Sequence, residues 1–285
     1  ILSHLLVGSE VTLGFISKVR LKTLEDHPHK SAALLFFKDI RSATETVIPL
    51  EEAGAQALEL MDRAALRSIQ DEPGMPEEIK SLPEASAALL CEFQARDVQE
   101  LSRKVEAGLK SLKKAKLIHP AKFTQDETTR LLYWKIRKGL LPSVGAVRKS
   151  GTTVIIEDVC FRLKDLADAT LELQGLFKKH GYTDAIIFGH AKDGNLHFVI
   201  SQTFADAAGI DQYENFIKDV VHMTVGTYDG ALKAEHGTGR NMAPFLQTEW
   251  GEVAVAIMQD LKALIDPDLL LNPGVIISDD PDIYL

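Results

Sequence analysis

The sequence has little cysteine, no excess of basic charge and no long apolar run. Its 285 residues include only two cysteines, Cys91 and Cys160, too few for a disulfide framework or a cysteine metal site, so we expect reduced thiols. The net charge of -9 argues against a nucleic-acid partner, because phosphate binding needs a basic surface. No apolar run approaches the roughly 20 residues of a transmembrane helix, and no signal segment opens the chain. We therefore expect a cytoplasmic protein without a transmembrane segment.

What the chain does contain is enough apolar sequence for a large core. Hydrophobic residues make up 45% of it, which suits one large domain or two lobes. The sequence begins at Ile1 in an apolar run, and its first fifteen residues resemble the interior of a domain. We therefore expect a fragment of a longer protein.

The spacing of apolar residues predicts alternating strands and helices. Two short strands are expected within residues 1–22. Further strands are expected at 31–37, 56–61, 87–94, 152–159, 184–188 and 196–201. Helices are expected at 40–53, 62–70, 97–116, 125–140, 163–180 and 209–228, with a last helix ending at Asp266. The elements come in two rounds, which predicts an α+β fold of ferredoxin-like type, single or duplicated, with an antiparallel sheet and helices on one face.

Two histidines flank a predicted hairpin turn in the second round. Residues 189–197 read GHAKDGNLH, and the Asp-Gly-Asn turn would bring His190 and His197 into one site. Imidazole nitrogens bind divalent metals such as zinc, and a third ligand is needed. Glu235 and His236, in the segment AEHGTGR, are the candidate sources. The alternative is that both histidines are ordinary polar residues beside a turn, and the spacing selects no particular metal.

Two further segments carry candidate binding chemistry. Arg137, in the predicted helical segment WKIR, could hold a carboxylate, because a guanidinium fork binds carboxylates bidentately. The alternative for Arg137 is a solvated charge on a helix face. The segment DPDLLLNPG contains Asn272 in an Asn-Pro-Gly sequence, which by itself indicates a tight turn.

Taken together, these stretches resemble the FAD-linked oxidases with a vanillyl-alcohol-oxidase-type flavin domain. The similar branch contains D-lactate dehydrogenase, D-2-hydroxyglutarate dehydrogenase and the flavin subunit of glycolate oxidase. The matching stretches follow the family's order: LLVGSEVTLGFIS, WKIR, GHAKDGNLH, AEHGTGR and DPDLLLNPG. The resemblance implies three parts: residues 1–22 as the end of an FAD-binding domain, 23–265 as a substrate (cap) domain, and 266–285 as a segment returning to the flavin side.

The resemblance also implies roles for individual residues. His190, His197 and Glu235 would ligate a divalent metal, for which the resemblance suggests zinc. His236 would be the catalytic base, and Arg137 would clamp the substrate carboxylate. The residues implied to lie against FAD are Gly8, Ser9, Glu10, Thr12, Gly14 and Asn272. The implied reaction is oxidation of a D-2-hydroxy acid to the 2-oxo acid, with hydride transfer to FAD.

Further implications concern partners and location. The family passes electrons to acceptors such as a quinone or a cytochrome, which would allow peripheral association with the inner membrane. A homodimer is also compatible with the resemblance. The ending LNPGVIISDDPDIYL resembles members that continue into a domain with an iron–sulfur cluster.

Several departures from the family pattern bear on activity. Val11 replaces a glycine of the first motif, where the backbone should approach the flavin closely. Val199 and Ile156 occupy positions where relatives acting on larger hydroxy acids place asparagine or lysine, which favours a monocarboxylate such as D-lactate. The family's pyrophosphate-binding segment is missing, so we expect weak FAD binding and an inactive fragment.

Two other functions are consistent with parts of the sequence. One is a stand-alone, non-redox module that binds a small hydroxy acid or a metal. The other is a metal-dependent hydrolase using the same His/His/Glu cluster, although no nucleophile is evident for it.

Overall fold

Six antiparallel strands form one sheet, in the order β1-β3-β2-β5-β6-β4. The computed structural model describes residues 2–285, without the side chains of Leu2 and of residues 143–147. The strands are β1 (His29–Phe37), β2 (Ala57–Asp62), β3 (Ala87–Ala95), β4 (Thr153–Cys160), β5 (Ile186–His190) and β6 (Asn195–Gln202). The predicted α+β class and antiparallel sheet are confirmed, and the six strands predicted from residue 31 onward are all present.

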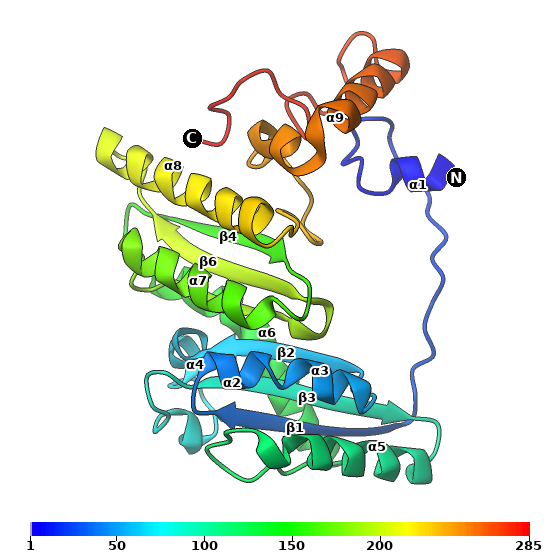
Figure 1. Cartoon of the computed structure of the whole chain (residues 1–285), viewed down its shortest axis with the longest axis vertical. Helices are drawn as coiled ribbons and strands as arrows, with labels where there is room; N and C mark the ends of the chain where they lie inside the picture. Colours follow the sequence, from blue (N-terminus) through cyan, green and yellow to red (C-terminus); the bar gives the residue numbers. More distant parts are fainter. Residues whose placement is uncertain (1) are drawn as a thin grey trace.

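The sheet is built from two halves (Figure 1). They meet where β2 pairs with β5. The first half carries α2 (Ile40–Thr44), α3 (Val47–Glu52) and α5 (Val98–Ser111), and the second carries α7 (Leu166–Lys179) and α8 (Ala207–Val221). The seam consists of three residue pairs: Glu59↔His190, Leu60↔Gly189 and Met61↔Phe188. Isolated bridges extend each half: Ala32↔Thr124 and Phe37↔Leu117 in the first, and Cys160↔Ala231 in the second.

Helices cover both faces of the sheet, so the prediction of helices on one face is wrong. The helices α2, α3, α5, α7 and α8 pack on one face. On the other face, α4 (Arg63–Ile69) and α6 (Glu127–Val147) pack over Phe36, Met61 and Leu90. The reason is visible in the strands, whose consecutive apolar residues leave both faces in need of cover. In β3, for example, Leu89 lies in one core and Leu90 in the other.

The N-terminal prediction is also wrong, because residues 1–22 contain no strand among those that the structure describes. They begin with α1 (Leu2–Leu6) and continue through turns. Gly8, Glu10 and Val11 have φ angles of 78°, 48° and 65°, values in the left-handed region that a strand cannot accommodate. An exposed extended segment then runs along one side of the molecule to β1 (Figure 1).

The last helix, α9 (Leu246–Ile265), lies with α1 and the C-terminal residues at one end of the molecule (Figure 1). It is interrupted at Gly251, where φ is 77° and ψ is 162°. Short helical turns complete the fold at Glu77–Ile79, Leu112–Lys114, Ala191–Asp193, His222–Thr227 and Ala243–Phe245. Within residues 2–285, no helix combines the length and apolarity needed to cross a membrane.

Candidate metal and substrate site

The hairpin between β5 and β6 brings the two predicted histidine ligands together. His190 ends β5, a short helical turn follows, and His197 lies in β6. The turn depends on glycine: a Cβ at Gly189 would lie 2.3 Å from the Asn195 carbonyl oxygen, and one at Gly194 would lie 1.9 Å from the Phe161 carbonyl oxygen. The two imidazole rings are 5.3 Å apart and nearly perpendicular.

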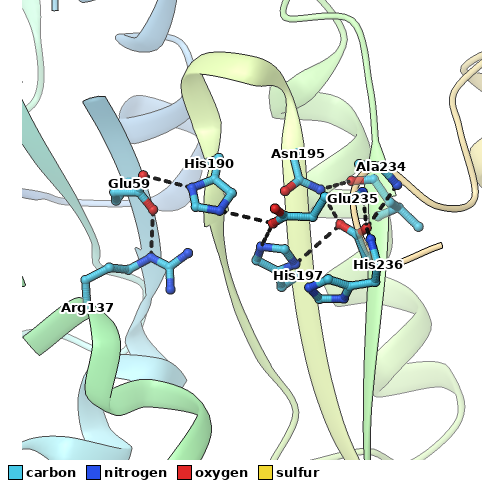
Figure 2. Close-up of polar contacts among 10 residues, drawn as sticks. Glu59, Arg137, His190, Asn195, His197, Ala234, Glu235 and His236 are labelled. Atoms are coloured by element: carbon cyan, nitrogen blue, oxygen red, sulfur yellow. Dashed lines mark hydrogen bonds and ion pairs between the residues drawn. The ribbon is translucent and has the colours of Figure 1, made fainter. Parts of the chain in front are cut away.

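Glu235 completes a convergent set of three potential ligands (Figure 2). Its Oε1 lies 3.1 Å from His190 Nε2 and 3.1 Å from His197 Nε2. The three ligand atoms all lie within 4.8 Å of one another. Two imidazole nitrogens and one carboxylate oxygen suit a divalent ion such as zinc, which leaves further coordination positions for water or substrate. The residues present therefore fit a divalent metal.

The loop that carries Glu235 and His236 is held by a buried carboxylate, Asp158. Its Oδ2 accepts hydrogen bonds from the backbone N–H groups of Ala234, Glu235 and His236, at 3.0, 2.6 and 2.9 Å. Burial alone would raise the pKa of Asp158, but contact with His197 and the hydrogen bonds from the loop outweigh it and lower that pKa below its usual range. Sequence reasoning missed this residue, although a charged residue in a β-branched strand was a usable signal.

His236 lies against the histidine pair. Its ring stacks on that of His197 with centroids 4.8 Å apart and planes inclined by 13°, and the residue is exposed. Asp158, His197 and His236 form a second close group of potential ligands. Because the Asp158 oxygens already accept N–H donors from the loop and from Asn195, this group suits a metal less well than the first.

Arg137 reaches the site through Glu59, a buried residue on β2 that sequence reasoning also missed. Arg137 Nε donates to Glu59 Oε2 at 2.8 Å, and its guanidinium carbon lies 4.6 Å from the centre of the Phe188 ring. The other oxygen of Glu59 lies 2.9 Å from His190 Nδ1 (Figure 2). This hydrogen bond raises the pKa of His190. The available signal was a glutamate within the apolar strand segment ALELM.

Two of the predicted flavin-side residues, Glu10 and Asn272, meet beside the His236 loop. The Glu10 carboxylate accepts the N–H groups of Thr238 and Gly239 at 2.6 and 2.9 Å. Asn272 Nδ2 donates to the Glu10 backbone oxygen at 2.5 Å. Gly237 is required here, because its φ is 81° and an added Cβ would lie 2.8 Å from the Glu10 carboxyl carbon.

Three more of the predicted flavin-side residues, Gly8, Ser9 and Thr12, line an apolar cavity of about 420 Å³ next to α9. The Ser9 hydroxyl is buried and finds no hydrogen-bond partner among the described residues. Gly14 does not line this cavity. The segment is anchored by Lys262, whose Nζ donates to the Thr12 backbone oxygen at 2.8 Å and to the Leu271 backbone oxygen at 2.7 Å. An unpaired hydroxyl beside glycine in a cavity fits a bound group such as a flavin.

A second cavity, of about 790 Å³, opens beside His236. Ile156 lines it, whereas Val199 is fully buried in the core beneath α6. Glu157, also in its wall, accepts hydrogen bonds from Lys233 and Asn241. Burial raises the pKa of Glu157. The positive charge of Lys233 is thus matched by a carboxylate within the cavity wall.

The domain is thus an antiparallel sheet covered by helices, with a histidine–histidine–glutamate cluster that could hold a metal ion and with Arg137 linked to it through Glu59. The sequence profile of the FAD linked oxidases, C-terminal domain, matches residues 26–276, and the chain belongs to this family. The resemblance drawn from the sequence motifs is thereby confirmed, and FAD is the cofactor that the family implies.

The chain is similar to curated dehydrogenases and oxidases whose names refer to 2-hydroxy acids. It is 28% identical to the mitochondrial D-lactate dehydrogenase [cytochrome] of Arabidopsis thaliana, over 97% of this chain and 47% of the relative. Glycolate oxidase subunit GlcD of Bacillus subtilis is 25% identical, over 98% of this chain and 57% of the relative. The mitochondrial D-2-hydroxyglutarate dehydrogenase of Arabidopsis thaliana is 28% identical, over 95% and 47%. The chain spans about half the length of these relatives.

Solved structures share the fold at low sequence identity. An alkyldihydroxyacetonephosphate synthase superposes with a TM-score of 0.58 at 17% identity, over 95% of this chain and 48% of that one. The 4-ethylphenol oxidase from Gulosibacter chungangensis gives a TM-score of 0.60 at 14% identity, over 89% of this chain and 55% of that one. At these identities the similarity establishes the fold.

Proposed function

We propose that the chain is the substrate-side part of an FAD-dependent dehydrogenase that oxidises a D-2-hydroxy acid, of the size of D-lactate, to the 2-oxo acid. The observation that carries the proposal is the convergence of His190, His197 and Glu235 beside His236 and the Glu59-held Arg137. The related D-lactate dehydrogenase and glycolate oxidase subunit support the substrate class.

The proposal includes a division of the chain. Residues 1–22 would end a flavin-binding domain, 23–265 would form the substrate domain, and 266–285 would return to the flavin side. The two halves of the sheet would be duplicated ferredoxin-like units. The bridges of Thr124 to β1 and of Ala231 to β4 support this, because each adds a fourth strand position to its half.

His190, His197 and Glu235 would hold a divalent metal such as zinc, and Gly8, Ser9, Glu10, Thr12, Gly14 and Asn272 would lie against FAD. When bound, FAD would supply the electron acceptor and the metal would supply a Lewis acid for the substrate oxygens. The protein's part is to bind and orient the acid and to move a proton.

His236 is the residue that takes the proton from the substrate hydroxyl in this proposal. Its ring is held by stacking on His197, and its backbone N–H is fixed by Asp158. The residue lines the second cavity, where a substrate can reach it. A positioned imidazole is the commonest general base in enzymes.

Arg137 would orient the substrate by its carboxylate. Its Nε donates to Glu59, which leaves its two terminal nitrogens as the proposed donors to the substrate. Those two nitrogens are the part of the guanidinium fork that pairs with a carboxylate bidentately. Stacking over Phe188 fixes the plane of the fork.

The cavity wall favours a small acid. Val154 and Ile156 give it an apolar side, and Lys233 is already paired with Glu157. A second carboxylate, as in D-2-hydroxyglutarate, would therefore find no unpaired cation at Lys233. Arg240, which also lines the cavity, donates to the Pro273 backbone oxygen. We propose a monocarboxylate because the wall at Val154 and Ile156 is apolar.

Partners and location follow from the same proposal. The electron acceptor would be a cytochrome, as in the name of the Arabidopsis relative, or a quinone. A cytoplasmic location with peripheral membrane association, a homodimer, and an iron–sulfur domain in the complete protein remain predictions.

Metal analysis tests the ligand set. The purified chain is expected to hold about one divalent metal, and His190→Ala/His197→Ala is expected to lose it. The matched control is His180→Ala/His222→Ala, which removes two histidines outside the site and should keep the metal. A metal retained by the first variant, or absent from wild type with its flavin portion attached, would overturn the assignment.

Anaerobic flavin reduction tests the substrate. In a protein that joins this chain to a flavin-binding portion, D-lactate should bleach the flavin absorbance, whereas L-lactate and D-2-hydroxyglutarate should do so poorly. Arg137→Lys should raise the D-lactate concentration for half-maximal reduction by about 10- to 100-fold, because a lysine cannot replace the bidentate pair. An oxidised flavin with every 2-hydroxy acid, in a metal-loaded protein, would refute the proposed activity.

A further inference from the structure

We propose that Glu59 is the positioning residue of this site, holding the metal ligand His190 and the substrate clamp Arg137 with one carboxylate. The inference rests on the proposed roles of those two residues and adds a third residue that acts through both. Glu59 itself touches neither the metal ligand atoms nor the expected substrate position.

The geometry divides the two oxygens of Glu59 between the two partners. Oε1 lies 2.9 Å from His190 Nδ1, and Oε2 accepts from Arg137 Nε at 2.8 Å (Figure 2). The three residues come from three elements: β2, β5 and α6. Glu59 is 5% exposed, so water competes little for its oxygens.

For His190, the contact selects the useful tautomer. A carboxylate at Nδ1 accepts a proton from that nitrogen, so the proton of the neutral ring stays on Nδ1 and the lone pair is left on Nε2. Nε2 is the atom that lies 3.1 Å from Glu235 Oε1, on the side of the proposed metal. Without an acceptor at Nδ1, both tautomers are available and only one of them can bind the metal.

For Arg137, the same carboxylate fixes the direction of the fork. The guanidinium is held at two points, by the bond from Nε to Glu59 and by the Phe188 ring, whose centre lies 4.6 Å from the guanidinium carbon. Glu59→Gln cannot accept from both Arg137 Nε and His190 Nδ1, because the amide has one acceptor oxygen and its NH2 group only donates. With almost no change of volume, the substitution therefore either breaks one of the two links or favours the Nε2–H tautomer of His190, in which Nδ1 accepts from the amide.

The chain offers a matched control in Glu92. It lies on the neighbouring strand β3 and is 4% exposed. Its carboxylate accepts from Trp134 Nε1 of α6 at 2.9 Å. The register Glu59↔Leu90 places Glu92 on the same face of the sheet as Glu59. Glu92→Gln thus perturbs a buried carboxylate under the same helix without touching His190 or Arg137.

The first measurement is Zn²⁺ affinity, by competition with a chromophoric chelator. Glu59→Gln should weaken binding by about 10- to 100-fold, the usual effect of removing the carboxylate behind a metal-bound histidine. Glu92→Gln should bind like wild type. Equal losses in the two variants would mean that Glu59 is merely structural, and wild-type affinity in Glu59→Gln would overturn the inference.

The second measurement needs no metal. Without a metal, Glu235 Oε1 at 3.1 Å is a competing acceptor at His190 Nε2, so this measurement uses the Glu235→Ala background. Ring ¹⁵N shifts of His190 in that background, at a pH where the neutral ring dominates, should show the Nδ1–H tautomer with Glu59 intact and with Glu92→Gln. Adding Glu59→Gln should give the Nε2–H tautomer or a mixture. This result decides the role of Glu59 whether or not the chain binds Zn²⁺, and an Nε2–H ring with Glu59 intact would overturn the inference.

Discussion

The contact between Glu10 and the His236 loop can be tested with a pair of glycines. Gly237 and Gly239 both have left-handed φ angles, 81° and 59°. A Cβ at Gly237 would lie 2.8 Å from the Glu10 carboxyl carbon, whereas one at Gly239 would meet nothing closer than the Asn241 nitrogen at 3.9 Å. Alanine at the two positions therefore shares the backbone penalty and differs in the clash with Glu10.

The expected magnitudes follow from these contacts. Alanine in the left-handed region costs about 1–2 kcal/mol at either position. Gly237→Ala must also displace the Glu10 carboxylate from Thr238 and Gly239, and hydrogen bonds to a charged group contribute about 1.5–3 kcal/mol each. Because Glu10 is only partly buried, we expect the lower part of that range, a difference of about 3 kcal/mol between the variants.

Hydrogen exchange at the Thr238 amide is the direct assay, since that N–H donates to Glu10. Gly237→Ala should speed exchange there by about 100-fold more than Gly239→Ala does, at 1.4 kcal/mol per factor of ten. In a Glu10→Ala background the difference between the two variants should vanish. Equal exchange in the two single variants would refute the reasoning, because it would mean that Glu10 does not restrain the loop.

Three further perturbations have defined outcomes. Val11→Gly should stabilise the protein by about 0.5–1 kcal/mol in denaturant titrations, because a β-branched residue 40% exposed at a φ of 65° is strained and the relief exceeds the entropy cost of glycine. Burial raises the pKa of Asp62 to about 6. The wild-type free energy of unfolding should therefore decrease as the pH rises from about 4 to 6, because the carboxyl ionises in the unfolded state first. Asp62→Asn should match wild type below pH 4 and exceed its free energy of unfolding by about 2–3 kcal/mol at pH 7; a pH-independent difference would contradict this. Lys262→Met removes the donor to Thr12 and Leu271, so limited proteolysis within residues 1–22 should accelerate, and an unchanged rate would show that the anchor is dispensable.

Local sequence patterns were sufficient for much of the fold. The apolar segments at 31–37 and 184–188 predicted β1 and β5 because short β-rich runs between turns are a local signal. The hairpin that brings His190 to His197 was predicted in the same way, from the Asp-Gly-Asn turn. Residue type and the order of the family motifs indicated the histidines and Glu235, and the structure places them together.

Contacts between distant segments were not predictable from such patterns. Glu59 and His190 are separated by 131 positions, and the sequence around either residue does not predict their contact. Both sheet faces are covered because α6 packs on the second one. The spacing of apolar residues within α6 does not predict which face it covers. The N-terminal alternation suggested strands, but the docking of Glu10 on Thr238 imposes turns instead.

The pairing of β2 with β5 fixes the spacing between the two parts of the site. Arg137 and Glu59 belong to the first half of the sheet, while the three potential metal ligands belong to the second. Three residue pairs set the register of β2 against β5. A slip of one residue there would turn Glu59 to the opposite face and separate it from both partners. In the proposed function, strand pairing would therefore set the length of acid that fits between Arg137 and the metal, and loop insertions elsewhere in the chain would leave that length unchanged.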